Sequence, residues 1–423
     1  MAQLSDDCFA FSGPLMPVAE VERLVVERVH PVNETELVEL SGAAGRVVAA
    51  EIRSTVDLPP FDNSAVDGFA VRHADLSPAG ETRLAIVDKV MAGHGSRRRL
   101  APGEAIRIFT GAPMPQGADT VFMQEDCREE GAAVIVPPGL KLGANRRAAG
   151  EDIAAGAVAL PAGRRLAPQH LALAAAVGLT RIEVRRRVRV ALFSTGDEIV
   201  EPGSPLPAAA LYDANRRLVA AMLARLGAEV TDLGILPDQP DSLAAAISEA
   251  ARAHDLVLTS GGVSTGEADH VRHAVEKVGR LVFWRVAIKP GRPVAMGVIP
   301  GVTSEHDAAF VGLPGNPVAV FVTFARVVRP LLLRLAGAVP EPLIALPVRA
   351  AFSYRKKKGR REYVRVALMR QGNGDIVASK YPREGAGVIT SLTETDGLAE
   401  LGEEITNIEP GAMIGFLPYA VLT

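Results

Sequence analysis

The spacing of apolar residues changes along the chain and predicts different structures in its first half. Residues 17–29 place Val21, Leu24 and Val25 at helical intervals between charged residues, which predicts an amphipathic helix. Residues 57–138 instead carry short β-branched runs separated by glycine and proline, and we expect them to form a small β domain. Helical spacing returns over residues 163–177, so the β domain is predicted to be an insertion in an elongated N-terminal domain.

Strand-like and helix-like segments alternate from residue 188 to residue 336. Apolar runs cover residues 188–193, 229–235, 255–260, 281–286 and 309–312, and helices are expected at residues 215–226, 242–253, 269–278 and 318–335. Parallel strands need a crossover connection, which a helix supplies. The alternation therefore predicts a parallel sheet covered by helices on both faces.

Beyond Gly337 the pattern is β again, with runs at residues 347–352, 362–368, 375–378 and 413–417. The predicted fold class is α/β plus β: a central parallel-sheet domain, an elongated N-terminal domain with an inserted β domain, and a C-terminal domain resembling a β-barrel. The predicted boundaries are 1–56 with 139–185 for the N-terminal domain, 57–138 for the insertion, 186–336 for the α/β domain and 337–423 for the C-terminal domain.

Composition is that of a folded globular protein and gives no sign of a polyanionic partner. The 423 residues correspond to about three domains at roughly 150 residues each. The formal net charge of -3 provides no global field for nucleic acid or an anionic membrane, and aromatic residues make up only 4%. We expect neither nucleic acid nor a membrane as a partner.

Cysteine usage and the N-terminus predict a soluble cytoplasmic protein. Cys8 and Cys127 are too few for a disulfide framework, which favours a reducing compartment. Residues 1–13 lack a basic residue and an apolar core long enough for a signal peptide. The longest uncharged apolar run, residues 171–179, is far shorter than the ~20 residues that span a bilayer.

Candidate chemistry lies in the loops that follow the predicted parallel strands, because such sheets bind ligands beyond the carboxyl ends of their strands. Four carboxylates fall in these loops, namely Asp197, Glu198, Asp238 and Asp269. Residues 260–266 form a loop of glycines and hydroxyls before a helix, which is typical of a phosphate cradle. Carboxylates beside phosphate suggest Mg²⁺ or a similar divalent cation. The alternatives are an ordinary βα turn and carboxylates that cap the following helices.

Three basic features allow both a functional and a structural interpretation. Arg285, Lys289 and Arg292 supply cations for phosphate or another oxyanion, or are solvated surface charges. His270 and His273 have a metal-ligand spacing, but a plain helix surface is favoured because no further ligand is near. Residues 355–361 are basic at six of seven positions, which suits a solvated hairpin tip or an anion-binding loop better than a nucleic-acid patch.

Two further segments, residues 58–70 and 110–115, have the composition of tight turns. Spacing and periodicity alone therefore lead to a phosphate-bearing ligand, with Mg²⁺ as a candidate ion, on an α/β domain flanked by β domains. They do not identify the substrate.

Taken together, these motifs resemble the MoeA family, the molybdopterin molybdenumtransferases that include the gephyrin E domain. The matching stretches occur in family order, at residues 60–68, 108–113, 150–153, 193–198, 212–215, 260–269, 287–291 and 312–317. The resemblance implies a homodimer with a MogA-like α/β domain. It implies insertion of molybdate into adenylylated molybdopterin, with release of AMP, and a molybdopterin adenylyltransferase and molybdoenzyme apoproteins as protein partners.

The resemblance also implies roles for individual residues. The expected catalytic residues are Asp67, Thr110, Glu198, Asp238, Asp269 and Lys289, of which Glu198, Asp238 and Asp269 hold the metal. Asp67 is expected to act on the partner subunit's site. The expected substrate-binding residues are Thr195, Gly196, Asp197, Asp213, Asn215, Ser260, Gly261, Gly262, Ser264, Gly266, Pro314, Gly315, Asn316 and Pro317. Molybdate is expected at Arg285, Lys289, Arg360, Gly385 and Ala386.

The chain departs from the family pattern at several positions. Arg285 and Arg292 stand where lysine is common, His270 where tyrosine is common, and residues 384–387 read Glu-Gly-Ala-Gly where Gln-Gly-Ser-Gly is frequent. A MogA-like adenylyltransferase, a gephyrin-type scaffold without enzymatic activity and a tungstate-inserting enzyme are the alternatives.

Overall fold

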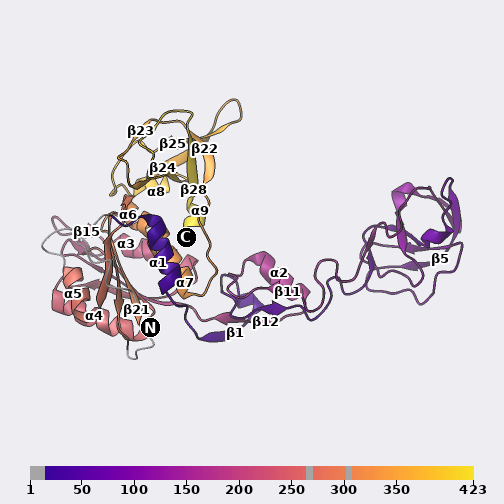
Figure 1. Ribbon diagram of the computed structural model, residues 1–423, viewed down its shortest axis with the longest axis horizontal. Helices are drawn as coiled ribbons and strands as arrows, with labels where there is room; N and C mark the ends of the chain where they lie inside the picture. Colours follow the sequence, from indigo (N-terminus) through magenta and orange to yellow (C-terminus); the bar gives the residue numbers. More distant parts are fainter. Residues whose placement is uncertain (1–14, 263–269, 302–306) are drawn as a thin grey trace.

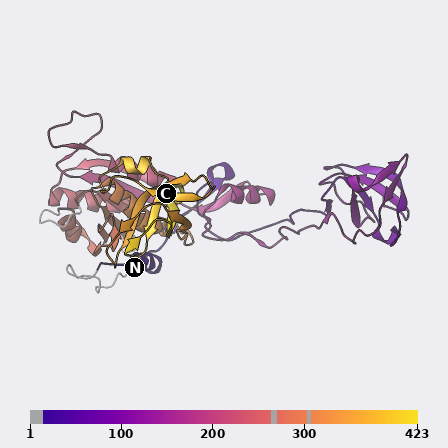
Figure 2. The ribbon, with the colours of Figure 1, turned by 90° about the horizontal axis from the view of Figure 1, so that it is seen from above.

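The computed structural model describes residues 15–262, 270–301 and 307–423, which form an elongated molecule (Figure 1). An α/β domain and a β-barrel lie together at one end, and a small β domain lies at the other (Figures 1 and 2). A thin middle region joins them. The predicted fold class is confirmed. Among the helices of the described residues, none is long and apolar enough to cross a membrane.

The α/β domain is built on a six-stranded sheet in the order β16-β13-β17-β21-β20-β18. Its strands are β13 (Arg189–Thr195), β16 (Glu229–Leu236), β17 (Leu256–Ser260), β18 (Arg280–Arg285), β20 (Pro293–Ile299) and β21 (Ala308–Leu313). β13, β16, β17 and β21 are parallel, and Thr195 pairs with Leu236 while Ser260 pairs with both Ser194 and Leu313. The carboxyl ends of four strands therefore finish in one row.

Strand β20 departs from the predicted parallel sheet, because it runs antiparallel to both β18 and β21. Only residues 286–292 connect β18 to β20. A parallel crossover needs a dozen or more residues, so this short connection forces a reversal. The sequence pattern hides the strand because Pro290, Gly291 and Pro293 interrupt the apolar run where it begins.

Helices cover both faces of this sheet, as predicted. One face carries α3 (Asn215–Arg225), α6 (Pro317–Thr323), α7 (Arg329–Leu335) and α1 (Val18–Arg28), and the other carries α4 (Pro240–Ala253) and α5 (His270–Val278). Leu192 shares one core with Val21 of α1, whereas the next residue, Phe193, packs with Ile247 of α4. Each such buried side chain contributes about 1.5–3 kcal/mol. Helix α1 thus belongs to the core of the α/β domain.

The C-terminal domain is a closed barrel of five strands. These are β22 (Leu346–Ala350), β24 (Arg361–Arg370), β25 (Ile376–Lys380), β26 (Gly397–Leu401) and β28 (Met413–Pro418). They follow the order β24-β25-β22-β28-β26, and β26 pairs again with β24 to close the barrel. The two-residue strand β19 (Ile288–Lys289) of the α/β domain adds to β24 in parallel and connects the two domains.

The middle region consists of paired two-stranded ribbons and one helix. Strand β1 (Thr35–Glu39) pairs with β12 (Arg181–Arg185), and β2 (Ile52–Arg53) pairs with β11 (Val158–Leu160). Helix α2 (Pro168–Ala176) completes a small separate core. The strands β3 (Asn63–Ser64) and β10 (Arg146–Arg147) pair where the chain enters and leaves the small β domain.

The small β domain is a six-stranded sheet in the order β7-β4-β6-β5-β9-β8, with an apolar cluster on each face. Its strands are β4 (Gly68–Val71), β5 (Thr82–Val90), β6 (Glu104–Ile108), β7 (Thr120–Met123), β8 (Arg128–Glu130) and β9 (Ala133–Val136). Gly68 of β4 lies against the backbone of β7, because a Cβ there would be 1.7 Å from the carbonyl oxygen of Phe122. The sequence requires glycine at this position for the strands to pair.

We expect Gly68→Ala to destabilise the small β domain by at least about 1–3 kcal/mol, because the new methyl group meets backbone that cannot move aside. Hydrogen exchange of β4 and β7 should accelerate while exchange in the α/β domain stays unchanged. Gly80→Ala is the matched control, since the nearest atom to its Cβ is the Ser77 hydroxyl at 3.7 Å. Equal exchange in the two variants would contradict this account of Gly68.

Candidate active site

The row of strand ends in the α/β domain brings the predicted acidic loops to one rim. Thr195, the last residue of β13, donates from its hydroxyl to the carbonyl of Leu236 at 3.1 Å and to Oδ1 of Asp238 at 3.2 Å. This buried threonine therefore fixes the start of the Asp238 loop. Asp197 and Glu198 follow immediately and are exposed to solvent.

Glycines let the chain turn sharply at this rim. Gly196 has a φ of 141°, and a Cβ there would come within 2.8 Å of the Glu198 carboxylate. Gly261 follows Ser260, and its Cβ would lie 2.5 Å from the carbonyl oxygen of Thr195. At Gly262, a Cβ would lie 2.4 Å from Val271 of α5. Close packing of strand, loop and helix therefore demands glycine at Gly261 and Gly262.

Several predicted residues of the same loop fall on chain that is not described. Ser264, Gly266 and Asp269 lie outside the described residues. Within the described part of the chain, no group of three or more histidine, cysteine, aspartate or glutamate side chains is placed to hold a metal ion. Among the described residues, His270 and His273 at the start of α5 therefore belong to no such group. Glu198 and Asp238 are the predicted metal ligands that remain.

The opposite side of the rim is formed by residues 314–317, which comprise the loop after β21 and the first residue of α6. Asn215 donates from its amide to the carbonyl of Gly315 at 2.7 Å and ties this loop to the start of α3. Pro317 occupies the first turn of α6, where its missing N–H costs nothing. Pro314, Gly315, Asn316 and Pro317 are thus held beside the end of β21.

Asp213 lies in a buried ion-pair network. Its carboxylate accepts from Nε of Arg216 at 2.9 Å, and both side chains are almost fully buried. Arg216 also pairs with Asp232 and Glu201. The contacts of Asp213 therefore hold the segment before Asn215 in place.

A hollow of about 330 Å³ lies where the α/β domain meets the barrel. Among its lining residues are the predicted Lys289, Gly385 and Ala386, together with Pro314 and Asn316 from the rim loop. Its charged lining residues are Lys289, Arg292, Arg365, Lys380, Arg383 and Glu384. Such an excess of cations suits an oxyanion.

Lys289 is held by residues of the barrel. Its ammonium lies 3.2 Å from the hydroxyl of Tyr354 and 3.2 Å from Oε2 of Glu362. Tyr354 donates to the same Oε2 at 2.8 Å, and Arg360 donates to Oε1 at 2.7 Å. Burial opposes the lysine charge, but the hydrogen bond to Tyr354 and the charge of Glu362 raise the pKa of Lys289 above its ordinary value. The ammonium therefore stays charged at neutral pH.

Arg285 and Arg360 do not line this hollow. Arg360 instead contacts Glu362 and so acts on Lys289 indirectly. Arg285 ends β18, where it pairs with Pro293, and its carbonyl accepts from the N–H of Met16 at 3.3 Å. Their assignment to the oxyanion stays a prediction.

The sequence reasoning missed Arg365, which lies in the hollow. It is 8% exposed, its Nε donates to Ser391 at 3.0 Å, and another guanidinium nitrogen donates to the carbonyl of Gly385 at 3.1 Å. Burial lowers its pKa, although a guanidinium remains charged. The sequence does contain a signal for it, because Arg365 lies between Val364 and Val366 in an apolar strand. A buried charge needs partners, which marks such an arginine as a candidate site residue.

Asp67 and Thr110 form one unit in the small β domain. Thr110 donates to Oδ1 of Asp67 from its backbone N–H at 2.8 Å and from its hydroxyl at 2.7 Å. These two hydrogen bonds lower the pKa of Asp67, so the carboxylate is charged and oriented. The domain lies at the far end of the molecule from the α/β rim (Figures 1 and 2). Within one chain the pair is therefore remote from the other predicted residues.

Three of the six basic residues in the run at residues 355–361 form ion pairs with neighbouring carboxylates. Arg361 pairs with Glu403, Lys358 pairs with Glu404, and Arg360 pairs with Glu362. The ammonium of Lys356 is buried and donates to the carbonyls of Gly402 and Ile405. These contacts support the interpretation as a structured loop tip.

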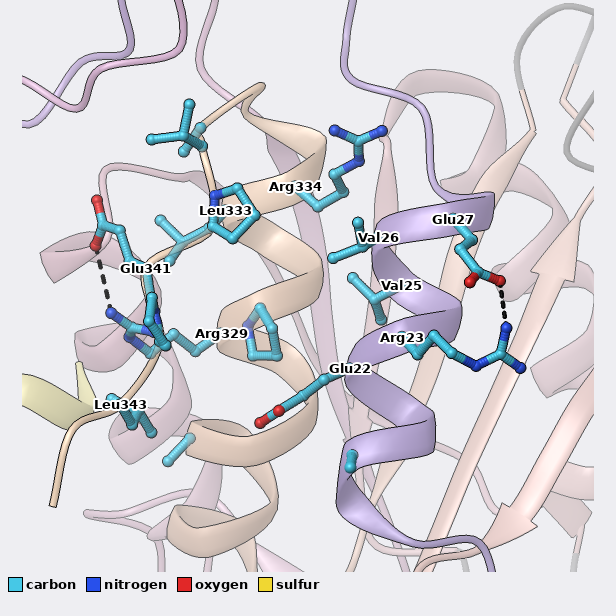
Figure 3. Close-up of a pocket in the computed structure, with 17 residues that line it drawn as sticks. Glu22, Arg23, Val25, Val26, Glu27, Arg329, Leu333, Arg334, Glu341 and Leu343 are labelled. Atoms are coloured by element: carbon cyan, nitrogen blue, oxygen red, sulfur yellow. Dashed lines mark hydrogen bonds and ion pairs between the residues drawn. The ribbon is translucent and has the colours of Figure 1, made fainter.

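A larger hollow, of about 460 Å³, lies away from both sites between α1, α7 and residues 338–343 (Figure 3). Its walls are mainly apolar, with Val25, Leu333 and Leu343 among them. Several of its charged residues pair with one another, as Arg23 does with Glu27 and Arg329 with Glu341. Size alone therefore does not mark the candidate active site.

Family models match the chain in three consecutive parts. The MoeA N-terminal region (domain I and II) matches residues 16–178, the probable molybdopterin binding domain residues 191–334, and the MoeA C-terminal region (domain IV) residues 347–419.

Curated proteins and a solved structure resemble nearly the whole chain. The molybdopterin molybdenumtransferase of Haemophilus influenzae is 35% identical over 410 residues, 96% of this chain and 99% of that protein. The protein of the same name from Bacillus subtilis is 31% identical over 95% of this chain and 94% of its own. The crystal structure of the molybdopterin biosynthesis MoeA protein from Pyrococcus horikoshii OT3 is similar with a TM-score of 0.78 and 28% identity, covering 96% of this chain and all of that one.

Proposed function

The chain belongs to the MoeA family of molybdopterin molybdenumtransferases, and from that premise we propose how its sites carry out the reaction. It is an enzyme that inserts molybdenum during synthesis of the molybdenum cofactor. Its relatives match the N-terminal and C-terminal regions as well as the α/β domain. A MogA-like adenylyltransferase would account for the α/β domain alone.

We propose that the substrate is adenylylated molybdopterin and that AMP is released when molybdate is inserted. The observation that carries this proposal is the loop at residues 314–317, because Pro314 and Asn316 follow strand β21 at the rim and also line the cationic hollow. The N–H of Val318 donates to the carbonyl of Ala386 at 3.0 Å and keeps the barrel loop against this loop. One ligand can therefore lie on the rim while an oxyanion occupies the hollow beside it.

On the rim, the glycine loop from Ser260 to Gly266 would hold the phosphates, assisted by Thr195 and Asn215. Glu198 and Asp238 would hold Mg²⁺ with Asp269, while Asp197 supports them. Two carboxylates beside phosphate fit the ligand preference of this ion, which also keeps phosphate oxygens and water. When bound, such an ion neutralises charge on the phosphate oxygens.

In the hollow, Lys289 and Arg365 would bind molybdate, with Lys380 and Arg383 nearby. Nε of Arg365 donates to Ser391, and one terminal nitrogen donates to the carbonyls of Arg383 and Gly385. Its other terminal nitrogen would therefore make the charge-assisted hydrogen bond to the anion. Ala386 has no hydroxyl, so backbone N–H groups of the turn at Gly385 would replace it. Arg360 would act by fixing Glu362, and Arg285 would contribute its positive charge without lining the hollow.

We further propose a homodimer in which the small β domain of one subunit reaches the site of the other. Within one chain Asp67 and Thr110 are remote from the rim, yet their carboxylate is charged and oriented by two hydrogen bonds. A site completed by the partner subunit's Asp67 accounts for both facts. A molybdopterin adenylyltransferase would supply the substrate, and molybdoenzyme apoproteins would receive the product.

The direct test is to incubate the purified protein with adenylylated molybdopterin and to measure AMP after addition of molybdate or tungstate. We expect AMP only when both the pterin and an oxyanion are present. AMP formation without any oxyanion, or consumption of ATP in place of the adenylylated pterin, would refute the proposed reaction.

We expect Glu198→Ala and Asp238→Ala each to slow AMP release at least about tenfold, equivalent to ~1.4 kcal/mol, because charge on the phosphates would no longer be balanced. Single-turnover assays measure this effect, and Mn²⁺ binding followed by electron paramagnetic resonance should weaken in parallel. Glu249→Ala, an exposed glutamate on α4, is the control. Wild-type rates and Mn²⁺ affinity in both rim variants would exclude these ligands.

Mixing an inactive Asp67→Ala chain with an inactive Glu198→Ala chain should restore activity, because a mixed dimer contains one site with both carboxylates. Differently tagged chains allow the mixed dimer to be isolated before AMP is measured. Isolated mixed dimers without activity would show that Asp67 does not act on the partner subunit.

Arg365→Ala should raise the half-saturating molybdate concentration roughly tenfold to a hundredfold, since a charge-assisted hydrogen bond is worth about 1.5–3 kcal/mol. Arg360→Ala should have a smaller effect, because Arg360 pairs with Glu362 and is not among the described residues that line the hollow. Arg349→Ala, on the exposed side of the barrel, serves as the control. A larger effect from Arg360 than from Arg365 would reverse the proposed assignment.

A further inference from the structure

The cationic hollow contains one carboxylate, that of Glu384, whose position requires an explanation. Its lining includes the side chains of Lys289, Arg292, Arg365, Lys380 and Arg383, all of positive charge, and Glu384 is the single acidic residue among the described lining residues. A fixed negative charge would repel any oxyanion that enters. A carboxylate is therefore expected here only if it has a function in the free protein.

Glu384 has a specific partner within the hollow. Its Oε1 lies 2.5 Å from the ammonium of Lys380, and the hydrogen bond to Lys380 lowers the pKa of Glu384. The carboxylate is therefore charged at neutral pH. The same ammonium lies 5.7 Å from the centre of the Tyr354 ring, whose hydroxyl contacts Lys289. Lys380 is thus close to the other cations that face the hollow.

Hydrogen bonds hold the backbone on both sides of Glu384, whereas its side chain is exposed and can rotate away from Lys380. Arg365 donates to the carbonyls of Arg383 and Gly385, and the carbonyl of Ala386 accepts from Val318. The Glu384 side chain is 66% exposed, while the side chain of Lys380 is 22% exposed. Rotation of Glu384 into solvent would release Lys380 without moving the loop.

We propose that Glu384 is an internal counter-anion, which neutralises Lys380 in the free protein and is displaced when the oxyanion binds. This inference rests on the proposed molybdate site and identifies Glu384 as a determinant of its affinity. In the empty hollow, the carboxylate reduces repulsion among neighbouring cations. Once molybdate is present, the dianion takes the place of Glu384 beside Lys380.

The proposal predicts the effect of Glu384→Gln on molybdate binding. The variant keeps the shape of the side chain and removes the competing charge, so the affinity for molybdate should increase roughly two- to fivefold, the scale of a partly exposed ion pair. Sodium molybdate titrated into the full chain by calorimetry gives this value, and the half-saturating concentration for AMP release should fall in parallel. Without molybdate, the variant should also unfold at a lower temperature, with the difference removed by saturating molybdate.

A double-mutant cycle separates this mechanism from a general effect of charge. In a Lys380→Ala background, Glu384→Gln should no longer increase the affinity, because no ammonium remains to be released. Glu394→Gln is the matched control, since this exposed glutamate of the same barrel accepts from Tyr381 and does not line the hollow. An undiminished gain in the Lys380→Ala background, or an equal gain from Glu394→Gln, would overturn the proposal.

Two further variants distinguish failure of this inference from failure of the molybdate site itself. If Lys289→Ala and Arg365→Ala both leave the molybdate affinity unchanged, the proposed molybdate site is wrong and the proposed role of Glu384 is refuted as well. If these variants weaken binding while Glu384→Gln binds molybdate like the wild type, only the role of Glu384 is refuted.

Discussion

A single buried carboxylate, Glu362, connects the α/β domain to the barrel and sets the geometry of the cationic hollow. It is 1% exposed, and a charge so buried is tolerated only when every oxygen has partners. Arg360 contacts one oxygen, and Tyr354 and Lys289 contact the other. Lys289 belongs to the α/β domain, and the other residues belong to the barrel. The Glu362 carboxylate therefore holds a cation of the α/β domain in the hollow between the two domains.

The pairing of β19 with β24 allows this contact to form. Residues 286–292 are too few for a crossover, and within this short connection between β18 and β20, Ile288 and Lys289 pair with strand β24 of the barrel. This pairing places Lys289 opposite Glu362. The antiparallel strand β20 and the position of Lys289 in the cationic hollow are therefore two results of the same short connection.

The elongated shape places the small β domain, which carries Asp67 and Thr110, at the far end of the molecule from the α/β domain (Figure 1). The small β domain has its own apolar clusters on both faces of its sheet, so it can present Asp67 and Thr110 without support from the α/β domain. The middle region has a separate small core and joins the two ends (Figure 1). The position and orientation of the Asp67 carboxylate therefore depend on contacts within the small β domain.

The alternation of strands and helices and the rim positions of Thr195, Asp238 and Gly261 could be predicted from the sequence, because they depend on local periodicity and on the rule that parallel strands end at one edge. The family could be recognised as well, but from the resemblance of motifs such as residues 60–68 and 312–317 rather than from periodicity. The side chains that line the cationic hollow could be known only from the tertiary structure, which places Arg365 in its lining and pairs Arg360 with Glu362. The tertiary structure also placed helix α1 in the core of the α/β domain. These outcomes depend on contacts between residues far apart in the chain, such as Lys289 with Glu362, and no local spacing encodes which partner a charged side chain finds after folding.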